Sequence, residues 1–347
     1  MNRKKFLIIR FSSIGDIVLT TTVIRCLKKQ YPEAEIHYLT KQVFKNILSP
    51  NPYVNKVFTL GFSMELLLHE LQSENYDYLI DLHKNLRSWR IKKHLGVKSF
   101  SFSKLNIKKW IFTNFKINLL PKVHIVDRYL KAIEKLDVKN DGEGLDYFLD
   151  IKDHVLTNDI PMSHRAGYIG IVIGAAHATK KLPVKKLRKL CELIKHPIIL
   201  LGGKEDKEAG EIIASSDPIK IYNASGKFSI NESAYLVSKA KLIITHDTGF
   251  MHIAAAFKKP IISIWGNTVP AFGMYPYFGE KHLQKKGMNA FEIIETGNLS
   301  CRPCSKIGYE KCPKTHFKCM EHISENYIVE KVTEYLSTID TKSNLFI

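Results

Sequence analysis

Two short segments of the chain place acidic, hydroxyl and glycine residues at the start of a helix. In one, Asp247, Thr248 and Gly249 follow the apolar run 242–244 and precede a run of small residues. Asp and Thr cap helix N-termini, and Gly leaves the backbone open to a group that approaches it. The free N–H groups and the positive end of the helix dipole predict an anion site suited to a diphosphate; an ordinary capped helix is the simpler alternative.

The other segment lies near the beginning of the chain. Residues 6–10 form an apolar run, 11–16 are typical of a turn, and 17–29 carry apolar residues at helical spacing. Asp16 therefore lies at the mouth of a strand-loop-helix unit, where α/β proteins place chemistry, unless it only caps the helix. No G-x-G-x-x-G motif follows the strand, so a nicotinamide dinucleotide site is not indicated.

The elements that must position these residues alternate between strand and helix. We expect strands at about 5–10, 35–40, 55–60 and 77–82, and then at 168–173, 197–201, 219–222, 241–245 and 260–264. Such alternation predicts an α/β fold with two doubly wound, Rossmann-like domains built on parallel sheets. Residues 1–160 form the first domain and 167–324 the second, with a linker at 158–166. Two such domains facing a cleft form the arrangement called GT-B.

Four motifs carry a resemblance to a known family. The segment 10–16, Arg-Phe-Ser-Ser-Ile-Gly-Asp, resembles the opening motif of the lipopolysaccharide heptosyltransferases, glycosyltransferase family 9. Residues 247–255 resemble the D-T-G-x-x-H-x-A-A signature of that family, and 266–268 resemble its G-P-T turn. Residues 180–183 resemble its K-x-W-P segment, with Leu182 in place of Trp. The resemblance also implies that the last helix, 325–338, packs back on the first domain.

The family implies transfer of heptose from ADP-heptose to an inner-core lipopolysaccharide acceptor, with inversion at the anomeric carbon. Such a transfer needs a base for the acceptor hydroxyl and positive charge for the departing diphosphate. Asp16 is the candidate base and Lys180 the candidate cation. Candidate donor-binding residues are Asp247, Thr248, Gly249, His252 and Thr268; candidate acceptor-binding residues are Arg10, Ser12, Ser13, Arg87 and Arg90. For His252, a buried core histidine is the alternative.

Two features bear on the cofactor and the donor. No D-x-D motif, which metal-dependent sugar transferases use to hold a divalent ion, occurs in the sequence, so catalysis is expected to need no cofactor. Ala175 and Ala176 stand where the family often has hydroxyl residues near the phosphates, so a different nucleotide sugar stays an alternative to ADP-heptose. A polyanion-binding protein without transferase activity is the alternative from another class, and the retained Asp16 and Lys180 argue against it.

The charge of the chain is large and uneven. The formal net charge is +18, and the stretch 84–126 holds eleven Lys or Arg residues interleaved with aromatic residues, but no Asp or Glu. This pattern suits an anionic membrane surface, although a solvated basic face is the simpler interpretation. No RNA-binding signature occurs, which disfavours nucleic acid as a partner. The resemblance implies a lipid-anchored, phosphorylated glycan acceptor on the cytoplasmic leaflet.

The remaining signals concern location and cysteine chemistry. The sequence has neither a signal-peptide pattern nor an apolar run of transmembrane length, which predicts a cytoplasmic protein. The family resemblance, together with the basic stretch, implies that it associates peripherally with the inner membrane. Four cysteines follow the spacing C-x2-C-x7-C-x6-C, which is compatible with a structural zinc or with free thiols in a reducing compartment. They are Cys301, Cys304, Cys312 and Cys319.

Overall fold

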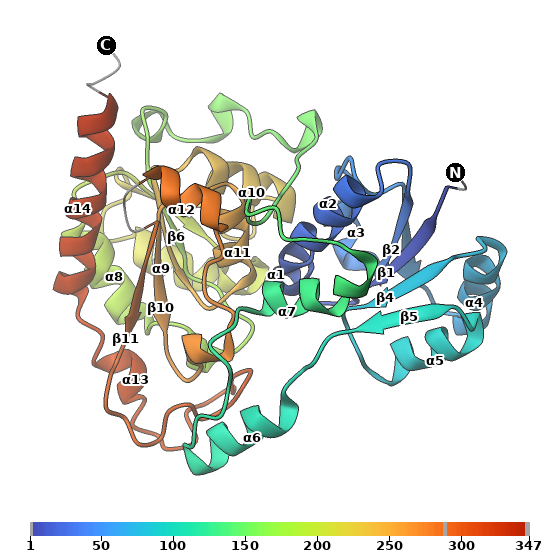
Figure 1. The fold of residues 1–347 in the computed structure, drawn as a ribbon. Coiled ribbons are helices and arrows are strands. Elements are labelled where there is room, and N and C mark those ends of the chain that lie inside the picture. The colour runs from blue at the N-terminus through green and yellow to red at the C-terminus, as the bar shows by residue number, and fades with distance from the viewer. Residues whose placement is uncertain (1–2, 287–289, 344–347) are drawn as a thin grey trace.

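The first domain is a parallel sheet covered by helices on both faces. The computed structural model describes residues 3–286 and 290–343 (Figure 1). Strands pair in the order β3-β2-β1-β4-β5. Their bounds are β1 (Lys5–Ile9), β2 (Glu35–Lys41), β3 (Lys56–Leu60), β4 (Tyr78–Asp81) and β5 (Lys98–Ser101). The helices are α1 (Ile14–Leu19), α2 (Thr21–Gln30), α3 (Lys45–Leu48), α4 (Met64–Ser73), α5 (Leu86–Leu95), α6 (Asn106–Phe115) and α7 (Ile125–Ala132).

The second domain repeats this design with a second parallel sheet, whose strand order is β11-β10-β9-β6-β7-β8. The strands are β6 (Ile169–Val172), β7 (Ile198–Leu201), β8 (Ile221–Asn223), β9 (Leu242–His246), β10 (Ile261–Trp265) and β11 (Phe291–Glu295). The helices are α8 (Val184–Leu193), α9 (Lys207–Ala214), α10 (Ile230–Lys239), α11 (Gly249–Ala256), α12 (Glu280–Lys286), α13 (Lys318–Glu321) and α14 (Glu325–Ser343).

The prediction of two doubly wound α/β domains is confirmed, and the structure adds strands that the sequence pattern missed. Both added strands, β5 and β11, lie at the edge of their sheet. Their sequences, Lys-Ser-Phe-Ser and Phe-Glu-Ile-Ile-Glu, carry polar residues because an edge strand is only partly covered. The central strands β1, β6 and β9 are almost wholly buried, which explains their continuous apolar runs.

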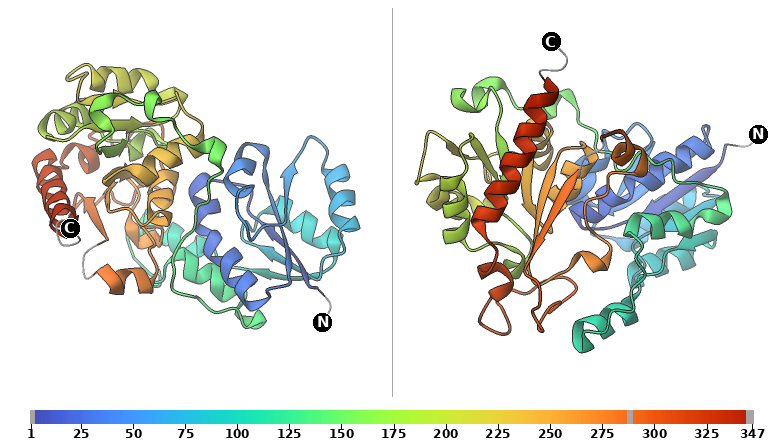
Figure 2. Two further views of the ribbon diagram at one scale, coloured as in Figure 1. Left: turned by 90° about the horizontal axis from the view of Figure 1, so that it is seen from above. Right: turned by 60° about the vertical axis from the view of Figure 1, so that its left-hand side comes forward.

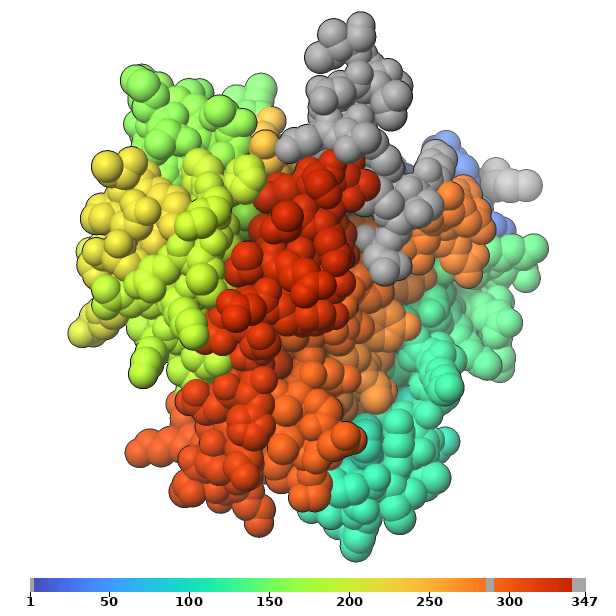
Figure 3. All heavy atoms as spheres, turned by 90° about the vertical axis from the view of Figure 1, so that its left-hand side faces the viewer, coloured from blue at the N-terminus to red at the C-terminus, as the bar shows by residue number. Residues whose placement is uncertain are grey.

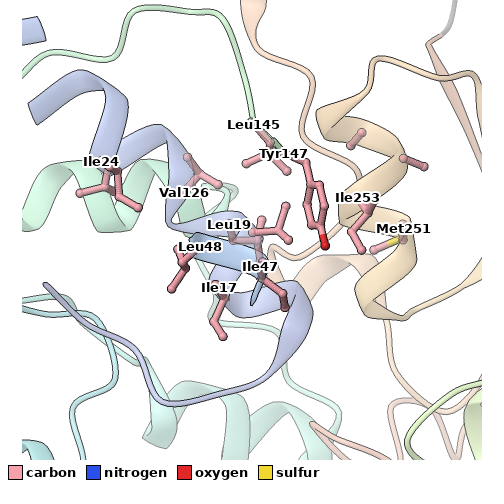
Figure 4. Packing of buried hydrophobic residues seen from close by; sticks show 14 of the residues in the cluster. Ile17, Leu19, Ile24, Ile47, Leu48, Val126, Leu145, Tyr147, Met251 and Ile253 are labelled. Atoms are coloured by element: carbon pink, nitrogen blue, oxygen red, sulfur yellow. The ribbon is translucent and has the colours of Figure 1, made fainter. Parts of the chain in front are cut away.

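The two domains meet where α1 crosses α11. A Cβ atom on Gly15 would lie 2.6 Å from the Cδ2 atom of His252, and one on Gly249 would lie 2.8 Å from the Cγ2 atom of Ile14. The absence of both side chains therefore allows the helices to touch. Around this crossing, Ile17 and Leu19 of the first domain and Ile253 of the second belong to one buried cluster (Figure 4).

The prediction that the last helix returns to the first domain is wrong. Helix α14 packs against α8, β9 and β10, all in the second domain (Figure 2, right; Figure 3). Its buried residues Ile328, Val332 and Leu336 belong to the apolar cluster that covers one face of the second sheet. Lys186 of α8 also forms a 3.0 Å ion pair with Glu325, so both packing and charge hold the helix on its own domain.

Within the described residues, no helix is both long and apolar enough to cross a membrane.

Candidate active site

The first half of the candidate site is an ion pair at the carboxyl end of β1. The guanidinium of Arg10 lies 2.6 Å from Asp16 Oδ1, and it also donates to the carbonyl oxygens of Leu82 and Ser12. The backbone N–H and the hydroxyl of Ser13 donate to Asp16 Oδ2 at 3.1 and 3.0 Å. Asp16 is therefore held by three donors, one from Arg10 and two from Ser13, and all of them lie in the loop that joins β1 to α1.

The environment keeps Asp16 ionised. Burial disfavours the charged carboxylate, but the charge of Arg10 and the hydrogen bonds from Ser13 outweigh it, so the pKa of Asp16 is lowered from its ordinary value. The side chain still exposes 17% of its surface. A carboxylate that is charged at neutral pH and reachable from solvent can accept a proton from a bound hydroxyl.

The second half of the site is a pair between Lys180 and Asp247. Lys180 ends a short turn after β6, and its Nζ atom lies 2.6 Å from Asp247 Oδ2. The hydroxyl of Thr268, after β10, donates to the same oxygen at 2.9 Å. Three loops at the carboxyl edge of the second sheet thus converge on one carboxylate, which is where doubly wound folds bind ligands.

Thr248 and Gly249 begin helix α11 beside this pair. Thr248 has an extended backbone at the N-cap position, and its hydroxyl contacts that of Thr245 at 3.3 Å. The backbone N–H groups of the first turn are the anion donors predicted from the sequence. The group that requires a glycine at 249, however, is the neighbouring helix α1, because a side chain there would meet Ile14 rather than a phosphate.

His252 is buried one turn further along α11. Burial lowers its pKa to about 4, so the ring is neutral at physiological pH. Its Nδ1 atom has no hydrogen-bond partner among the described residues, and its Cδ2 edge faces Gly15 of α1. The structure therefore supports the alternative of a core histidine at the domain contact and shows no bond from His252 to Asp247.

Cationic side chains near Asp16 form a feature that the motif analysis did not single out. Burial lowers the pKa of Lys109 to about 8, with Arg128 as the next cause, and burial also lowers the pKa of Lys104, followed by the charge of Arg10. Arg128 is buried; it donates to the carbonyl of Ser103, while its Nε atom has no partner among the described residues. One buried and two partly buried cations without a full set of partners favour an anionic ligand. The absence of acidic residues in 84–126 was the available signal.

Arg87 and Arg90, named as acceptor residues from the sequence, are not part of this cluster. Both are exposed on α5, and within the described residues neither makes a hydrogen bond or ion pair. Lys92 on the same helix turns inward instead, and its Nζ atom lies 3.3 Å from Asp81.

Comparison with known proteins identifies the family. A family model described as glycosyltransferase family 9 (heptosyltransferase) matches residues 64–285, well over half of the chain. The chain belongs to glycosyltransferase family 9.

Individual relatives of the chain support the same family assignment. The chain is 29% identical to lipopolysaccharide heptosyltransferase 1 of Campylobacter coli, over 95% of this chain and 98% of that protein. It is 27% identical to lipooligosaccharide heptosyltransferase 2 of Haemophilus influenzae, over 77% of this chain and 84% of the relative. This protein is therefore a glycosyltransferase.

Solved structures share the fold. A glycosyl transferase family 9 protein from Veillonella parvula superposes with a TM-score of 0.74 at 20% identity, covering 97% of this chain and 98% of that one. The E. coli heptosyltransferase WaaC with ADP superposes with a TM-score of 0.68 at 19% identity, covering 95% and 99%. The GT-B architecture expected from the sequence is confirmed.

In this family 9 chain, Arg302 fastens the loop that carries Thr268. Its guanidinium donates to the carbonyl oxygens of Gly266, Thr268 and Thr296 and pairs with Glu295 at 2.8 Å. The segment that follows also reaches the Lys180 turn, because the hydroxyl of Thr179 receives a 2.8 Å hydrogen bond from the backbone of residue 309. The segment 296–309 therefore ties together the two loops that flank Asp247.

The cysteines of the family 9 chain lie in and beside this segment, but they do not form a ready metal site. Within the described residues, these thiols are not among the groups gathered closely enough to share one ion. The Cys304 thiol donates to the carbonyl of Cys301 at 3.0 Å, and burial raises the pKa of Cys319 to about 11. Both observations fit free thiols better than zinc thiolates, and the zinc stays an untested prediction.

The group of possible metal ligands that the described residues do gather is Glu35, His37 and Glu74. Lys5 lies 3.4 Å from Glu35 and 2.9 Å from Glu74, and Lys56 lies 2.6 Å from Glu74. Because these lysines already neutralise the carboxylates, the group is an ion-pair network on the first sheet, remote from β1's carboxyl end.

Proposed function

We propose that this glycosyltransferase moves heptose from ADP-heptose to the inner core of lipopolysaccharide, with inversion and without a catalytic metal. The relatives named as lipopolysaccharide or lipooligosaccharide heptosyltransferases and the ADP-bound neighbour support this choice of donor and acceptor. The observation that carries the proposal is the pair of charged sites, Arg10–Asp16 and Lys180–Asp247, on the two sides of the α1–α11 contact.

In the proposed reaction, a hydroxyl of the acceptor attacks the anomeric carbon of the donor heptose. The new carbon–oxygen bond forms on one face of the sugar while the bond to the diphosphate oxygen breaks on the other, so the configuration inverts. The proton of the hydroxyl passes to the carboxylate of Asp16, and ADP leaves with the bonding electron pair. Lys180 and the N–H groups that begin α11 stabilise the charge that develops on the diphosphate.

The acceptor would be held by the cations of the first domain. Lys104, Lys109 and Arg128 offer positive charge close to Asp16 that no described carboxylate fully neutralises. Acidic sugars and phosphate groups of an inner core match such a cluster. We further propose that the enzyme works at the cytoplasmic face of the inner membrane, where a lipid-anchored acceptor would lie.

The direct test is transfer by the purified protein to an inner-core acceptor that lacks the heptose. We expect ADP release together with a mass increase of one heptose in the acceptor. A thermal-shift panel sharpens the donor assignment, because a ligand that binds only the folded state raises the unfolding midpoint. ADP should raise it more than UDP or GDP. Stabilisation by UDP or GDP alone would contradict ADP-heptose as donor, and polyanion binding without ADP release would favour the non-catalytic alternative.

A further inference from the structure

Helix α6 is unusual for a helix of a globular domain, because none of its residues is buried. Its large apolar side chains are instead turned outward: Ile107 exposes 76% of its surface, Trp110 57% and Phe115 61%. The chain that follows continues the pattern with the exposed residues Ile117 and Leu119. In Figure 1, α6 lies at the lower edge of the molecule, apart from the helices that cover the first sheet. Contiguous exposed apolar surface of this kind marks an interaction site.

The opposite side of α6 is fixed to the protein, which defines its orientation. Phe112 packs edge to face against the ring of Phe272, and Lys116 donates to the carbonyl oxygen of Pro303 at 2.8 Å. Lys109 lies with its Nζ atom 5.8 Å from the ring of Phe272. These contacts come from positions 109, 112 and 116, which share one helical face. Ile107 and Trp110 lie on the other face, directed away from the protein.

The surroundings of the outward face decide which partner it suits. The stretch 84–126 contains eleven basic residues and no acidic one, and Lys108 is exposed between Ile107 and Lys109. Apolar side chains with a tryptophan, flanked by lysines on a short helix, match the headgroup boundary of an anionic bilayer. A protein partner would have to supply a large acidic surface, and nucleic acid would leave the aliphatic side chains in water.

We propose that α6 is the element that inserts into the anionic lipid surface, with Ile107, Trp110 and Phe115 in the acyl boundary. The proposal rests on the proposed function, since it specifies how that enzyme meets a membrane-bound acceptor. Within the basic stretch 84–126, it selects α6 rather than α5 as the docking element. Because Lys109 sits on the inner face of the same helix, insertion of α6 brings the cationic cluster beside Asp16 to the level of the lipid headgroups.

The tryptophans of the chain give a direct test. Trp89 on α5 and Trp110 on α6 are exposed to a similar extent, 53% and 57%, and Trp265 is buried. Vesicles of phosphatidylglycerol and phosphatidylcholine are added to two full-length variants, Trp89→Phe and Trp110→Phe. We expect the emission of Trp89→Phe, which retains Trp110, to shift to the blue and to be quenched by brominated acyl chains. We expect Trp110→Phe to show neither change. The reverse result would overturn the proposal in favour of α5.

A second set of variants measures the affinity. One variant combines Ile107→Ser, Trp110→Ser and Phe115→Ser. The matched control combines Ile151→Ser, Leu156→Ser and Met162→Ser, which lie elsewhere and are at least as exposed. We expect at least tenfold weaker co-sedimentation with the vesicles for the first set and an unchanged value for the control. Equal binding of both sets would refute insertion. Two other results would refute insertion because they assign this face to another partner. One is steeply salt-dependent binding to oligonucleotides, and the other is a dimer of the wild type in solution that becomes a monomer in the α6 variant but not in the control.

The assay of transfer separates this proposal from the proposed function. With a water-soluble, deacylated acceptor, the α6 variant should match the wild type, whereas with acceptor in vesicles it should be at least tenfold slower. Failure of both proteins to release ADP from ADP-heptose would contradict the proposed function. If the wild type and the α6 variant both transfer normally with acceptor in vesicles, the role of α6 is contradicted and the proposed function is not.

Discussion

The two domains use the same device at their facing edges, an aspartate next to a helix start paired with a cation at 2.6 Å, but they build it differently. Arg10 comes from the loop just before α1, the helix that carries Asp16, and it also donates to the carbonyl oxygens of Leu82 and Ser12. Lys180 comes from a neighbouring loop, 67 residues from Asp247 in the chain. Among the described residues, its Nζ atom hydrogen-bonds only to the carboxylate and the carbonyl oxygen of Asp247.

This difference fits two chemical tasks. An arginine with several fixed contacts stays in place and keeps the neighbouring carboxylate charged. A lysine whose described hydrogen bonds all go to one aspartate can exchange that carboxylate for an incoming diphosphate at little cost, because one charged partner replaces another. In the proposed mechanism, the first pair supplies a base that is already ionised, and the second supplies a cation that can turn to the diphosphate.

The largest effect should come from removing the base. Asp16→Asn should lower kcat by roughly 10²–10⁴-fold, because proton transfer from the acceptor loses its acceptor group, while donor affinity stays nearly unchanged. Steady-state kinetics and calorimetry with ADP measure the two quantities. Glu33→Gln, which alters an exposed carboxylate after α2, is the control. Near-normal turnover in Asp16→Asn would remove this residue from the mechanism.

Removal of Lys180 should have the next largest effect on the rate. Lys180→Ala should lower kcat by about 10²–10³-fold, since the diphosphate loses one charged donor as it departs. Lys185→Ala changes an exposed lysine of α8 and should leave the rate unaltered. The comparison is made with saturating donor so that weakened binding does not enter. Equal kcat values for Lys180→Ala and Lys185→Ala would contradict the proposed role of Lys180 in stabilising the leaving group.

The protonation of Asp16 can be examined through the pH dependence of kcat/KM. Burial alone would raise the pKa of Asp16, and Arg10 is the largest influence that lowers it. Arg10→Gln should therefore raise the pKa of Asp16. As the pH is lowered, kcat/KM of this variant should begin to fall at a higher pH than that of the wild type. Arg10→Lys retains the charge and should shift the acid limb less. An unchanged acid limb in Arg10→Gln would mean that Arg10 does not set the protonation of the base.

A smaller effect, on stability, should follow from filling the helix crossing. Gly249→Val introduces atoms where Ile14 and Gly15 of α1 already lie, and overpacking of this kind costs about 1–3 kcal/mol. Gly61→Val is the matched control, since nothing lies within 4 Å of a Cβ atom there. Denaturant unfolding compares the pair. An equally stable Gly249→Val with weakened ADP affinity would return Gly249 to the phosphate role predicted from the sequence.

The smallest effect is expected from chelation. In the proposed mechanism, Lys180 and the start of α11 supply the positive charge that a divalent cation supplies elsewhere, so EDTA should leave the initial rate within about twofold. Loss of activity that Mg²⁺ or Mn²⁺ restores would contradict this. Slow unfolding in EDTA with a normal initial rate would instead reveal a structural ion at the cysteines.

The sequence predicted the architecture well because buried parallel strands leave continuous apolar runs, as in β1, β6 and β9. It missed β5 and β11, whose polar residues are tolerated at a sheet edge. The family resemblance misplaced α14, and the helix's own apolar pattern could not correct this, because such a pattern does not indicate which domain the helix covers.

For the site, the motifs named Asp16, Arg10, Lys180 and Asp247, but spacing along the chain cannot reveal that they form two ion pairs. Nor could the basic stretch indicate that Lys109 turns inward while Arg87 stays in water. That choice depends on how the connection around α6 packs against the second domain, through contacts such as Phe112 with Phe272.

The position of α14 has a consequence for how the protein is held together. Because this helix stays on its own domain, the backbone passes between the domains only once within the described residues, through the segment around 156–163. A cut there would leave both sheets and their helices whole, and would turn the α1–α11 association from an intramolecular into a bimolecular equilibrium. In the intact chain, the segment 156–163 keeps the two domains at a high effective concentration for each other, in the millimolar range for a short linker. Two halves expressed separately are therefore expected to associate with an affinity that reports the strength of the α1–α11 contact.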